Sequence, residues 1–185
     1  MKIIQTELEN VLVIEPRVFG DERGFFLETF QAERYRASGI DYEFVQDNLS
    51  CSRRGVLRGL HLQNPRQQGK LVYVLKGEVY DVVVDVRLGS PTFGRWICRV
   101  LNDRNKHQIW VPPGFAHGFC VLSDTVLFAY KCTDYYSPED EITVRWDDPV
   151  LSIDWPTTEV SLSEKDASAP CLADIDPGRL PRLVK

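Results

Sequence analysis

Three histidines, at positions 61, 107 and 117, are the imidazoles available for chemistry in this chain. A neutral imidazole has an ordinary pKa of about 6.5, so it can accept a proton near neutral pH. His61 ends the segment RGLH and His117 ends the segment PPGFAH, whereas His107 follows a polar turn and is assigned no role. Taken alone, His61 is more often a hydrogen-bonded core histidine than a base.

A lysine and a tyrosine are further candidates for charge and proton chemistry. Lys70 begins an apolar run, where it is either a solvated strand-end residue or a cation held inside the domain. A cation in a partly dry pocket would stabilise a developing negative charge. Tyr130 shares an apolar face of residues 125–133 with Phe128 and Cys132. A tyrosine on such a face more often packs than acts as an acid.

The five cysteines, at positions 51, 98, 120, 132 and 171, include no Cys-x-x-Cys pair. This spacing argues against a zinc ribbon or a redox motif. Four of them lie in or beside strand-like segments, where we expect small buried thiols rather than nucleophiles.

The elements that must position these residues are mostly strands, because runs of alternating apolar residues dominate the chain. In residues 78–87, Tyr80 and the even-numbered valines form one face, while Asp81, Asp85 and Arg87 share the other. Further strands are expected at 11–14, 24–30, 44–48, 56–63, 71–75, 95–101, 108–111, 119–122, 125–133 and 142–146. A short helix is expected at 31–37, and an irregular tail from about residue 147 should run over the β domain. Many short strands predict an all-β sandwich, jelly roll or small barrel.

Composition sets the broad class of the protein. The 185 residues, 43% of them hydrophobic, suit a single globular domain spanning 1–185. With 22 basic and 27 acidic residues the net charge is −5, which provides no general basic field for nucleic acid. No segment has the roughly 20 consecutive apolar residues of a membrane-spanning helix. We expect a cytoplasmic protein that binds neither nucleic acid nor membrane.

Two segments resemble the sequence motifs of the cupin superfamily of β-barrels. Residues 55–63 (GVLRGLHLQ) resemble the first motif and residues 112–117 (PPGFAH) the second. Cupins often bind a metal through His-x-His and a glutamate of the first motif and a histidine of the second. Here Gln63 replaces the second histidine, and Lys70 stands where the glutamate is expected. Because an ammonium group repels a divalent cation, metal dependence is not expected.

A longer match extends from residue 19 to residue 166. It comprises FGDERGFF (19–26), FVQDN (44–48), LRGLH (57–61), QGKLV (68–72), PGFAHGF (113–119) and LSEKD (162–166). In their order and spacing these blocks resemble the dTDP-4-dehydrorhamnose 3,5-epimerase family. The resemblance implies a cupin-type jelly roll, or double-stranded β-helix barrel, with short peripheral helices. It also implies a homodimer that inverts C3 and C5 of dTDP-4-dehydro-6-deoxy-D-glucose without metal or organic cofactor, on the route to dTDP-L-rhamnose and cell-surface polysaccharide such as lipopolysaccharide.

The family's residue roles carry over position by position. His61 resembles the base and Asp166 its orienting partner, Lys70 the group that stabilises the enolate, and Tyr130 the acid on the opposite face. Both inverted carbons flank the C4 ketone, so a base, a partner for the enolate oxygen and an acid are the groups the reaction needs. The substrate-binding positions that match are Arg23, Glu28, Gln46, Asp47, Asn48, Arg58, Lys70, His117, Tyr136, Glu141 and Lys165. Arg23, Arg58 and Lys165 suit the diphosphate, and Tyr136 suits stacking on thymine.

The sequence is compatible with several alternative functions. A relative that inverts only C3 or only C5, or a ketoisomerase, would use the same base, and a nucleotide-sugar-binding cupin without catalysis would need neither Asp166 nor Tyr130. A metal-dependent oxygenase is disfavoured by Gln63 and Lys70. Asp81 is either a second carboxylate near His61 or a hydrogen-bonded barrel residue.

The spacing of Arg58 and His61 predicts a local irregularity in their strand. Arg58 and His61 are three residues apart, so a regular strand would point them to opposite faces. We expect a bulge at Gly59 to bring both to one side.

Overall fold

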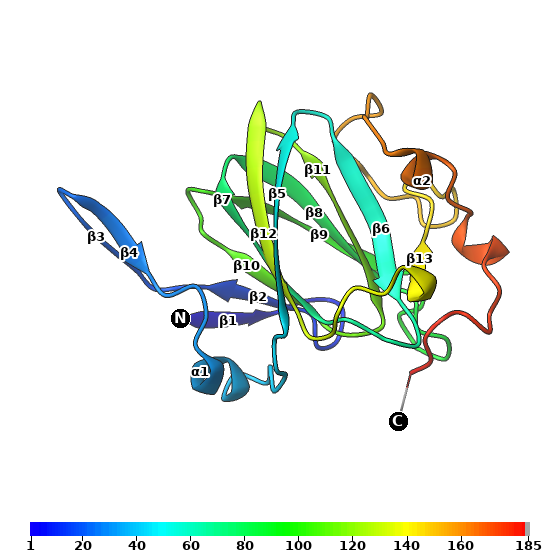
Figure 1. The fold of residues 1–185 in the computed structure, drawn as a ribbon, viewed down its shortest axis with the longest axis horizontal. Helices are drawn as coiled ribbons and strands as arrows, with labels where there is room; N and C mark the ends of the chain where they lie inside the picture. The colour runs from blue at the N-terminus through cyan, green and yellow to red at the C-terminus, as the bar shows by residue number, and fades with distance from the viewer. Residues whose placement is uncertain (184–185) are drawn as a thin grey trace.

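The alternating apolar runs fold into two facing sheets, in a computed structural model that describes residues 1–183 (Figure 1). The six-stranded sheet has the order β1-β2-β10-β7-β12-β5 and the five-stranded sheet the order β13-β6-β11-β8-β9. The first sheet contains β1 (Lys2–Gln5), β2 (Leu12–Glu15), β5 (Gln46–Arg53), β7 (Lys70–Lys76), β10 (Gln108–Val111) and β12 (Thr125–Cys132). The second contains β6 (Leu57–Gln63), β8 (Glu78–Asp85), β9 (Trp96–Asn102), β11 (Phe115–Val121) and β13 (Glu141–Thr143). Neighbouring strands pair antiparallel, as a jelly-roll barrel requires.

The remaining elements are short and peripheral. Strands β3 (Val18–Asp21) and β4 (Gly24–Leu27) form a separate hairpin that projects away from the barrel in Figure 1. The helices are α1 (Ala32–Arg36) and α2 (Glu164–Ala167), with single 3-10 turns at Pro138–Asp140 and Leu172–Asp174. In residues 1–183 no helix is long and apolar enough to cross a membrane.

The main core fills the space between the two sheets. It includes Val72, Ile109 and Phe128 from the six-stranded sheet and Val83 and Phe119 from the five-stranded sheet. These side chains are at most 5% exposed. Their burial removes apolar surface from water, and Phe119 and Phe128 of this core also line the pocket described below.

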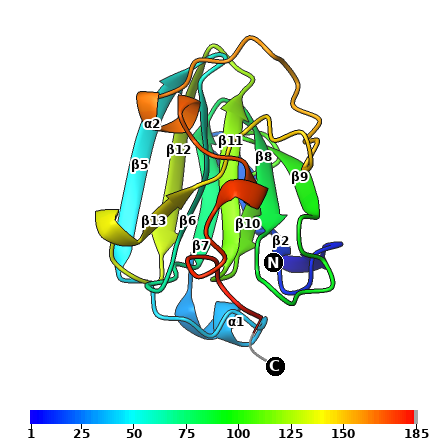
Figure 2. The same cartoon turned by 90° about the vertical axis from the view of Figure 1, so that its right-hand side faces the viewer.

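The C-terminal tail covers the outer face of the five-stranded sheet, as Figure 2 shows for the orange-to-red segment in front of β11 and β8. Leu151, Leu172 and Leu180 of the tail pack against Val82 and Val84 of β8. Strand β8 is therefore buried on both faces. Asp81 and Asp85 lie on the opposite face with Val79 and Val83, which belong to the core between the sheets, and both are inaccessible to solvent.

Several boundaries differ from the sequence expectation. The helix begins after its cap at Gln31, within the expected range, but the strand expected at 24–30 ends at Leu27. Strands β1 and β3 were not expected, because both are short and lack a clear apolar alternation, and β3 is exposed throughout. Cys51 contradicts the expectation of buried thiols, since it lies on the outer face of the edge strand β5 and is exposed.

Candidate active site

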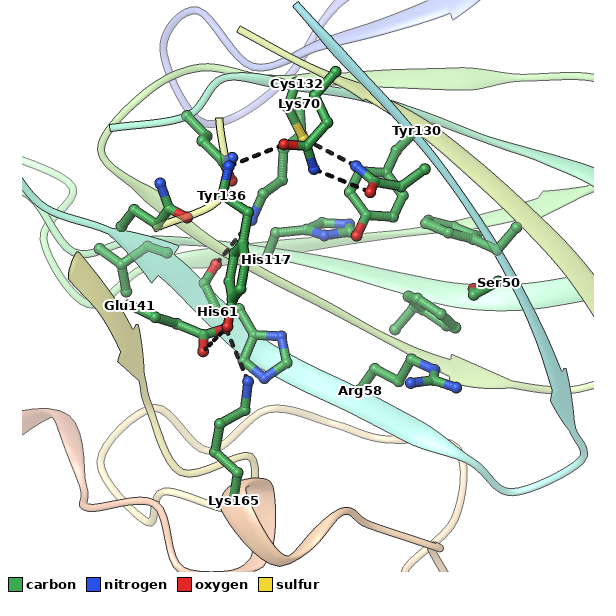
Figure 3. A pocket seen from close by; sticks show the side chains of 17 residues that line it. Ser50, Arg58, His61, Lys70, His117, Tyr130, Cys132, Tyr136, Glu141 and Lys165 are labelled. Atoms are coloured by element: carbon green, nitrogen blue, oxygen red, sulfur yellow. Dashed lines mark hydrogen bonds and ion pairs between the residues drawn. The ribbon is translucent and has the colours of Figure 1, made fainter. Parts of the chain in front are cut away.

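A pocket of about 380 Å³ opens between the two sheets at one end of the barrel (Figure 3). Its floor and walls come from both sheets, and its rim comes from the segment after β12, from β13 and from α2. It is lined by Gln46, Asn48, Ser50, Arg58, His61, Leu62, Gln63, Gln68, Lys70, His117, Phe119, Phe128, Tyr130, Cys132, Tyr136, Glu141 and Lys165. The structure thus brings together most of the residues that the sequence comparison placed in the site.

His61 projects from β6 and is held by a carboxylate from a distant part of the chain. Its Nε2 lies 2.6 Å from Oδ1 of Asp166, which is 3% exposed. Burial alone would raise the pKa of Asp166, but the hydrogen bond and charge of His61, together with the Ser163 hydroxyl, lower that pKa below its usual value. Asp166 therefore stays ionised at neutral pH. Its carboxylate fixes the ring of His61 and favours the imidazolium when the other nitrogen accepts a proton.

A capped helix turn supports this carboxylate. Ser163 is the N-cap of α2, and its hydroxyl accepts a hydrogen bond of 3.1 Å from the amide of Asp166. The backbone amide of Leu57 in turn donates to the carbonyl of Ser161, which joins the tail to the start of β6. The tail and the strand that carries His61 are therefore fixed relative to each other.

Lys70, the first residue of β7, is buried in the pocket wall at 9% exposure. Its Nζ donates to the carbonyl oxygen of His61 at 3.4 Å, and no carboxylate of residues 1–183 forms an ion pair with it. Burial lowers the pKa of Lys70, since desolvation disfavours the charged form. Lys70 is therefore a buried residue rather than a solvated strand-end residue, and an anion bound in the pocket would stabilise its ammonium form.

Tyr130 enters the pocket from β12, in the sheet opposite the one that carries His61. Its neighbours Phe128 and Cys132 are buried, as the apolar face of this strand predicts. Burial, followed by the effect of Cys132, raises the pKa of Tyr130, so the phenol keeps its proton near neutral pH. Figure 3 shows Tyr130 and His61 on different sides of the cavity.

The bulge expected at Gly59 is confirmed by the pairing of β6 with β11. His61 pairs with His117 and Arg58 with Phe119, so three steps along β6 match two along β11. Gly59 has φ +126°, and a Cβ there would lie 2.6 Å from the Cα of Gly118. Glycine is thus required, and the bulge lets both Arg58 and His61 face the pocket.

His117 forms a second pair with a carboxylate, deeper in the barrel. Its Nε2 lies 2.9 Å from Oδ2 of Asp81, which is inaccessible to solvent, and its ring stacks on Phe128. Burial raises the pKa of Asp81, an effect that His117 opposes. Asp81 is therefore the partner of His117 and not of His61. Sequence reasoning left this open, and only the pairing of β8 with β11 resolves it.

The rim carries a connected polar cluster. The hydroxyl of Tyr136 donates to Glu141 at 3.1 Å, and Lys165 donates to the other oxygen of the same carboxylate at 2.8 Å. Burial would raise the pKa of Glu141, but Lys165 and His61 lower it. Gln46 accepts from the amide of Tyr136 and donates to Asn48. Half of the Tyr136 side chain remains exposed as a flat surface beside the pocket.

Three of the residues expected to bind substrate lie outside this pocket. Asp47 points to the outer face of β5, where it pairs with Lys131. Arg23 is at the tip of the β3–β4 hairpin and pairs with Asp21, and Glu28 follows that hairpin. The structure therefore assembles the catalytic candidates in one chain, but it does not bring the hairpin residues to them.

Gln63 has a structural function where a metal-binding cupin has a histidine. Its side-chain amide donates to the carbonyl oxygens of Arg66 and Tyr135, and its oxygen accepts from the amide of Ser137. These bonds hold the segment that carries Tyr136. The side-chain amide of Gln63 is already used in hydrogen bonds to the backbone, and Lys70 carries a basic amine. The side chains at these two cupin ligand positions therefore do not fit a divalent metal.

The family model described as dTDP-4-dehydrorhamnose 3,5-epimerase matches residues 5–174. A protein of that name from Pseudomonas aeruginosa is 52% identical over 178 residues, which are 95% of this chain and 98% of that protein. A similar solved structure is the crystal structure of the dTDP-6-deoxy-D-glucose-3,5-epimerase RmlC from Legionella pneumophila in complex with dTDP-4-keto-L-rhamnose. Its sequence is 57% identical to this chain and its TM-score is 0.97, with the match covering 100% of this chain and 99% of the RmlC chain. The crystal structure of the 3'-monoepimerase ChmJ from Streptomyces bikiniensis in complex with dTDP-quinovose has a TM-score of 0.90 and 37% sequence identity. That match covers 96% of this chain and 91% of the ChmJ chain.

Proposed function

The chain belongs to the dTDP-4-dehydrorhamnose 3,5-epimerase family, and from this premise we infer that its pocket converts dTDP-4-dehydro-6-deoxy-D-glucose into dTDP-4-dehydro-L-rhamnose. It is an isomerase with the cupin-type jelly-roll fold. The reaction inverts C3 and C5 by removing and returning a proton at each carbon. The observation that carries the assignment of residues is the hydrogen bond of 2.6 Å between His61 and Asp166, in a pocket that also contains a buried lysine.

The first half of each inversion is a proton removal. The nitrogen of His61 that Asp166 does not hold accepts the proton from the carbon, and the electron pair of the broken C–H bond moves to the ketone oxygen at C4. The imidazolium that forms is stabilised by the carboxylate of Asp166. The enolate oxygen is stabilised by the ammonium group of Lys70, in surroundings that exclude most solvent.

The second half is a proton return from the other face of the sugar ring. Tyr130 stands on the sheet opposite His61, so a ring between them would present different faces to the two side chains. The phenol donates its proton to the carbon, the enolate returns to the ketone, and the phenolate is left. Solvent then restores the phenol and removes the proton from His61. Return by His61 itself would only restore the original configuration.

The nucleotide occupies the mouth of the pocket in this proposal. Tyr136 offers an aromatic face for thymine, and Arg58 and Lys165 supply cations for the diphosphate. His117, Gln46 and Asn48 are proposed to contact the substrate from the inner walls. Two cations beside the mouth explain how a chain with net charge −5 attracts a diphosphate, since the local charge differs from the overall charge.

Replacing His61 with asparagine tests these roles. We expect His61→Asn to abolish turnover of the 4-dehydro sugar while its affinity for dTDP, measured by calorimetry, stays close to that of the unchanged protein. The reason is that the imidazole acts on the sugar carbons and not on the nucleotide. Equal losses of turnover and of dTDP affinity would contradict the assignment of His61 as the base.

We further propose that the protein is a homodimer in which the β3–β4 hairpin completes the partner's site. The hairpin exposes Phe25 at 60% and Phe26 at 69%, which is a large apolar surface for a monomer. Arg23 and Glu28 match substrate-binding positions of the family but lie outside the pocket of their own chain. A second copy would cover the aromatic residues and receive both side chains.

Paired variants test this arrangement. Arg23→Ala and His61→Asn chains with different tags are co-expressed, and the mixed dimer is purified through both tags. If Arg23 serves the partner, one site of the mixed dimer contains both native residues and turnover returns. An inactive mixed dimer, or a monomer in light scattering, contradicts the proposal. The cytoplasmic location and the role in cell-surface polysaccharide synthesis stay predictions.

A further inference from the structure

The hydroxyl of Ser50 is buried in the pocket wall without a protein partner. Among the side-chain nitrogen and oxygen atoms of residues 1–183, it is the buried one to which no other described group forms a hydrogen bond. Buried polar groups in folded proteins nearly always have a partner, so an exception requires an explanation. Because Ser50 lines the pocket, a bound ligand is a suitable partner.

The position of Ser50 on its strand places it among the other inward-facing side chains. Along β5 the exposed residues Leu49 and Cys51 alternate with residues that face the barrel. Ser50 and Ser52 are thus neighbours on the inner face, with their Cα atoms about 7 Å apart as strand geometry requires. Ser52 is 5% exposed and also belongs to the interior.

Ser52 holds the side chain of Arg58. The Nε of Arg58 donates to the hydroxyl of Ser52 at 3.1 Å. Neither Nη nitrogen of Arg58 has a hydrogen-bonding partner within residues 1–183, and no carboxylate there pairs with it. The bond to Ser52 therefore fixes the guanidinium group while its two outer nitrogens stay available.

These groups form a site for an anion. Figure 3 shows Ser50 and Arg58 on one side of the pocket, while Glu141 and Lys165 lie on the other. Glu141, the one carboxylate among the lining residues, is already paired with Lys165. A hydroxyl donor beside a guanidinium fork matches the oxygens of a phosphoryl group, which can accept from both.

We propose that Ser50 is a ligand of the substrate's diphosphate and that Ser52 is the positioning residue for Arg58. The inference rests on the proposed function and extends it, because only cationic side chains were expected at the diphosphate and neither serine was assigned a role. In this arrangement Ser50 donates its hydroxyl hydrogen to a phosphoryl oxygen, and the same oxygen or its neighbour accepts from an Nη group of Arg58. Ser52 contributes through Arg58 and touches no substrate atom.

Binding measurements on single variants test the role of Ser50. We expect Ser50→Ala to weaken dTDP binding by about tenfold in calorimetry, because a hydrogen bond to a charged group is lost. Binding of thymidine, followed by saturation-transfer NMR, should not change. The melting temperature without ligand should be unchanged or higher, because the hydroxyl has no partner to lose. Cys51→Ala, on the outer face of the same strand, is the matched control and should bind dTDP normally.

A double-mutant cycle tests the role of Ser52. Ser52→Ala should weaken dTDP binding in the native background but have no further effect in Arg58→Ala, because it acts only through that side chain. Additive losses would contradict the positioning role.

Each outcome for Ser50 distinguishes the two proposals. If the unchanged protein binds dTDP and Ser50→Ala binds it equally well, the inference about Ser50 is wrong and the proposed function stands. If Ser50→Ala melts at a lower temperature and loses thymidine as well, Ser50 is a structural residue. If the unchanged protein neither binds dTDP nor turns over the sugar, the proposed function itself is wrong.

Discussion

Replacing Lys70 with methionine should make the protein more stable and much less active. The ammonium group is buried, and the carbonyl of His61, at 3.4 Å, is its hydrogen-bond acceptor within residues 1–183. Methionine has a similar length and no charge, so it fills the same space without a desolvation penalty. Removing an incompletely compensated buried charge should raise the free energy of unfolding by about 1–3 kcal/mol. For a chain of this length, that corresponds to an increase of roughly 2–12 °C in melting temperature.

The stability difference should depend on pH. Burial lowers the pKa of Lys70 below its ordinary value of 10.5, so the unfolded chain binds more protons than the folded chain between the two values. The unfolding free energy of the native protein therefore rises with pH in that window, relative to Lys70→Met. The advantage of the variant should be largest below the folded-state pKa of Lys70 and should shrink as the pH rises toward about 10.5.

The loss of activity follows from the same charge. An ammonium group about 4 Å from an enolate oxygen attracts it with an electrostatic energy of roughly 4 kcal/mol at an effective dielectric constant of about 20. Removing one preorganised oxyanion partner from an active site costs about 10²–10³ in kcat. We expect a loss of that size in Lys70→Met, measured by coupling product formation to a downstream reductase.

A matched control lies on the same strand. Lys76 ends β7 and is exposed, so Lys76→Met should change neither the unfolding free energy nor the turnover appreciably. Urea denaturation at pH 7 and pH 10 provides the stability comparison. If Lys70→Met is less stable than the native protein at pH 7, or keeps its turnover, the account of Lys70 as an uncompensated internal cation is refuted.

Three further predictions concern the dyad, the acid and the bulge. Asp166→Asn should lower kcat by about 10²–10⁴, measured by product formation, since His61 loses its orienting carboxylate. Because the pKa of Asp166 is lowered in the folded state, its stabilising contribution is present above about pH 4 and disappears as the pH falls further. On acidification, the free energy of unfolding of Asp166→Asn should therefore decline less steeply than that of the native protein. Tyr130→Phe should slow inversion by about 10²–10⁴, but His61 should still exchange the substrate's carbon-bound protons for deuterium with retained configuration. Loss of this exchange in NMR would contradict the assignment of Tyr130 as the acid. Gly59→Ala should cost about 3 kcal/mol in urea denaturation, because its Cβ meets the backbone of β11, whereas Gly94→Ala, with open space around it, should cost clearly less.

The sequence predicted the parts of the fold that depend on local pattern. The apolar alternation in residues 125–133 correctly placed Tyr130 on the inner face of β12, and the three-residue spacing of Arg58 and His61 correctly required a bulge at Gly59. The all-β jelly roll and the family were also predicted, since the motif blocks keep their order along most of the chain. These features are encoded within single strands or single motifs.

Contacts between distant segments could not be predicted in the same way. Asp81 and His117 are 36 residues apart and become partners only through the register of β8 and β11. The burial of β8 on both faces depends on where the C-terminal tail packs, which its irregular composition does not specify. The lack of a partner for Ser50 is likewise a property of the assembled pocket, because a serine at an alternate strand position has no distinctive signal.

The hairpin of β3 and β4 shows a different limit. Its adjacent aromatic residues Phe25 and Phe26 both remain exposed, so neither face of this short strand is buried by the rest of the chain. A hairpin that is exposed on both faces lacks the one-sided apolar alternation that marks a strand packed on the core. This is why the strand was predicted too long and its partner strand was missed.

Proton NMR of dTDP-4-dehydro-6-deoxy-D-glucose, incubated with chelator-treated protein in deuterated water, tests the central claim most directly. Abstraction at both carbons by His61, with return by Tyr130, predicts that deuterium enters C3 and C5 and that the L-lyxo product is trapped by a downstream reductase. Deuterium at a single carbon would contradict double inversion and indicate a single-centre epimerase. No exchange at either carbon, despite binding of dTDP, would contradict the enolate chemistry altogether.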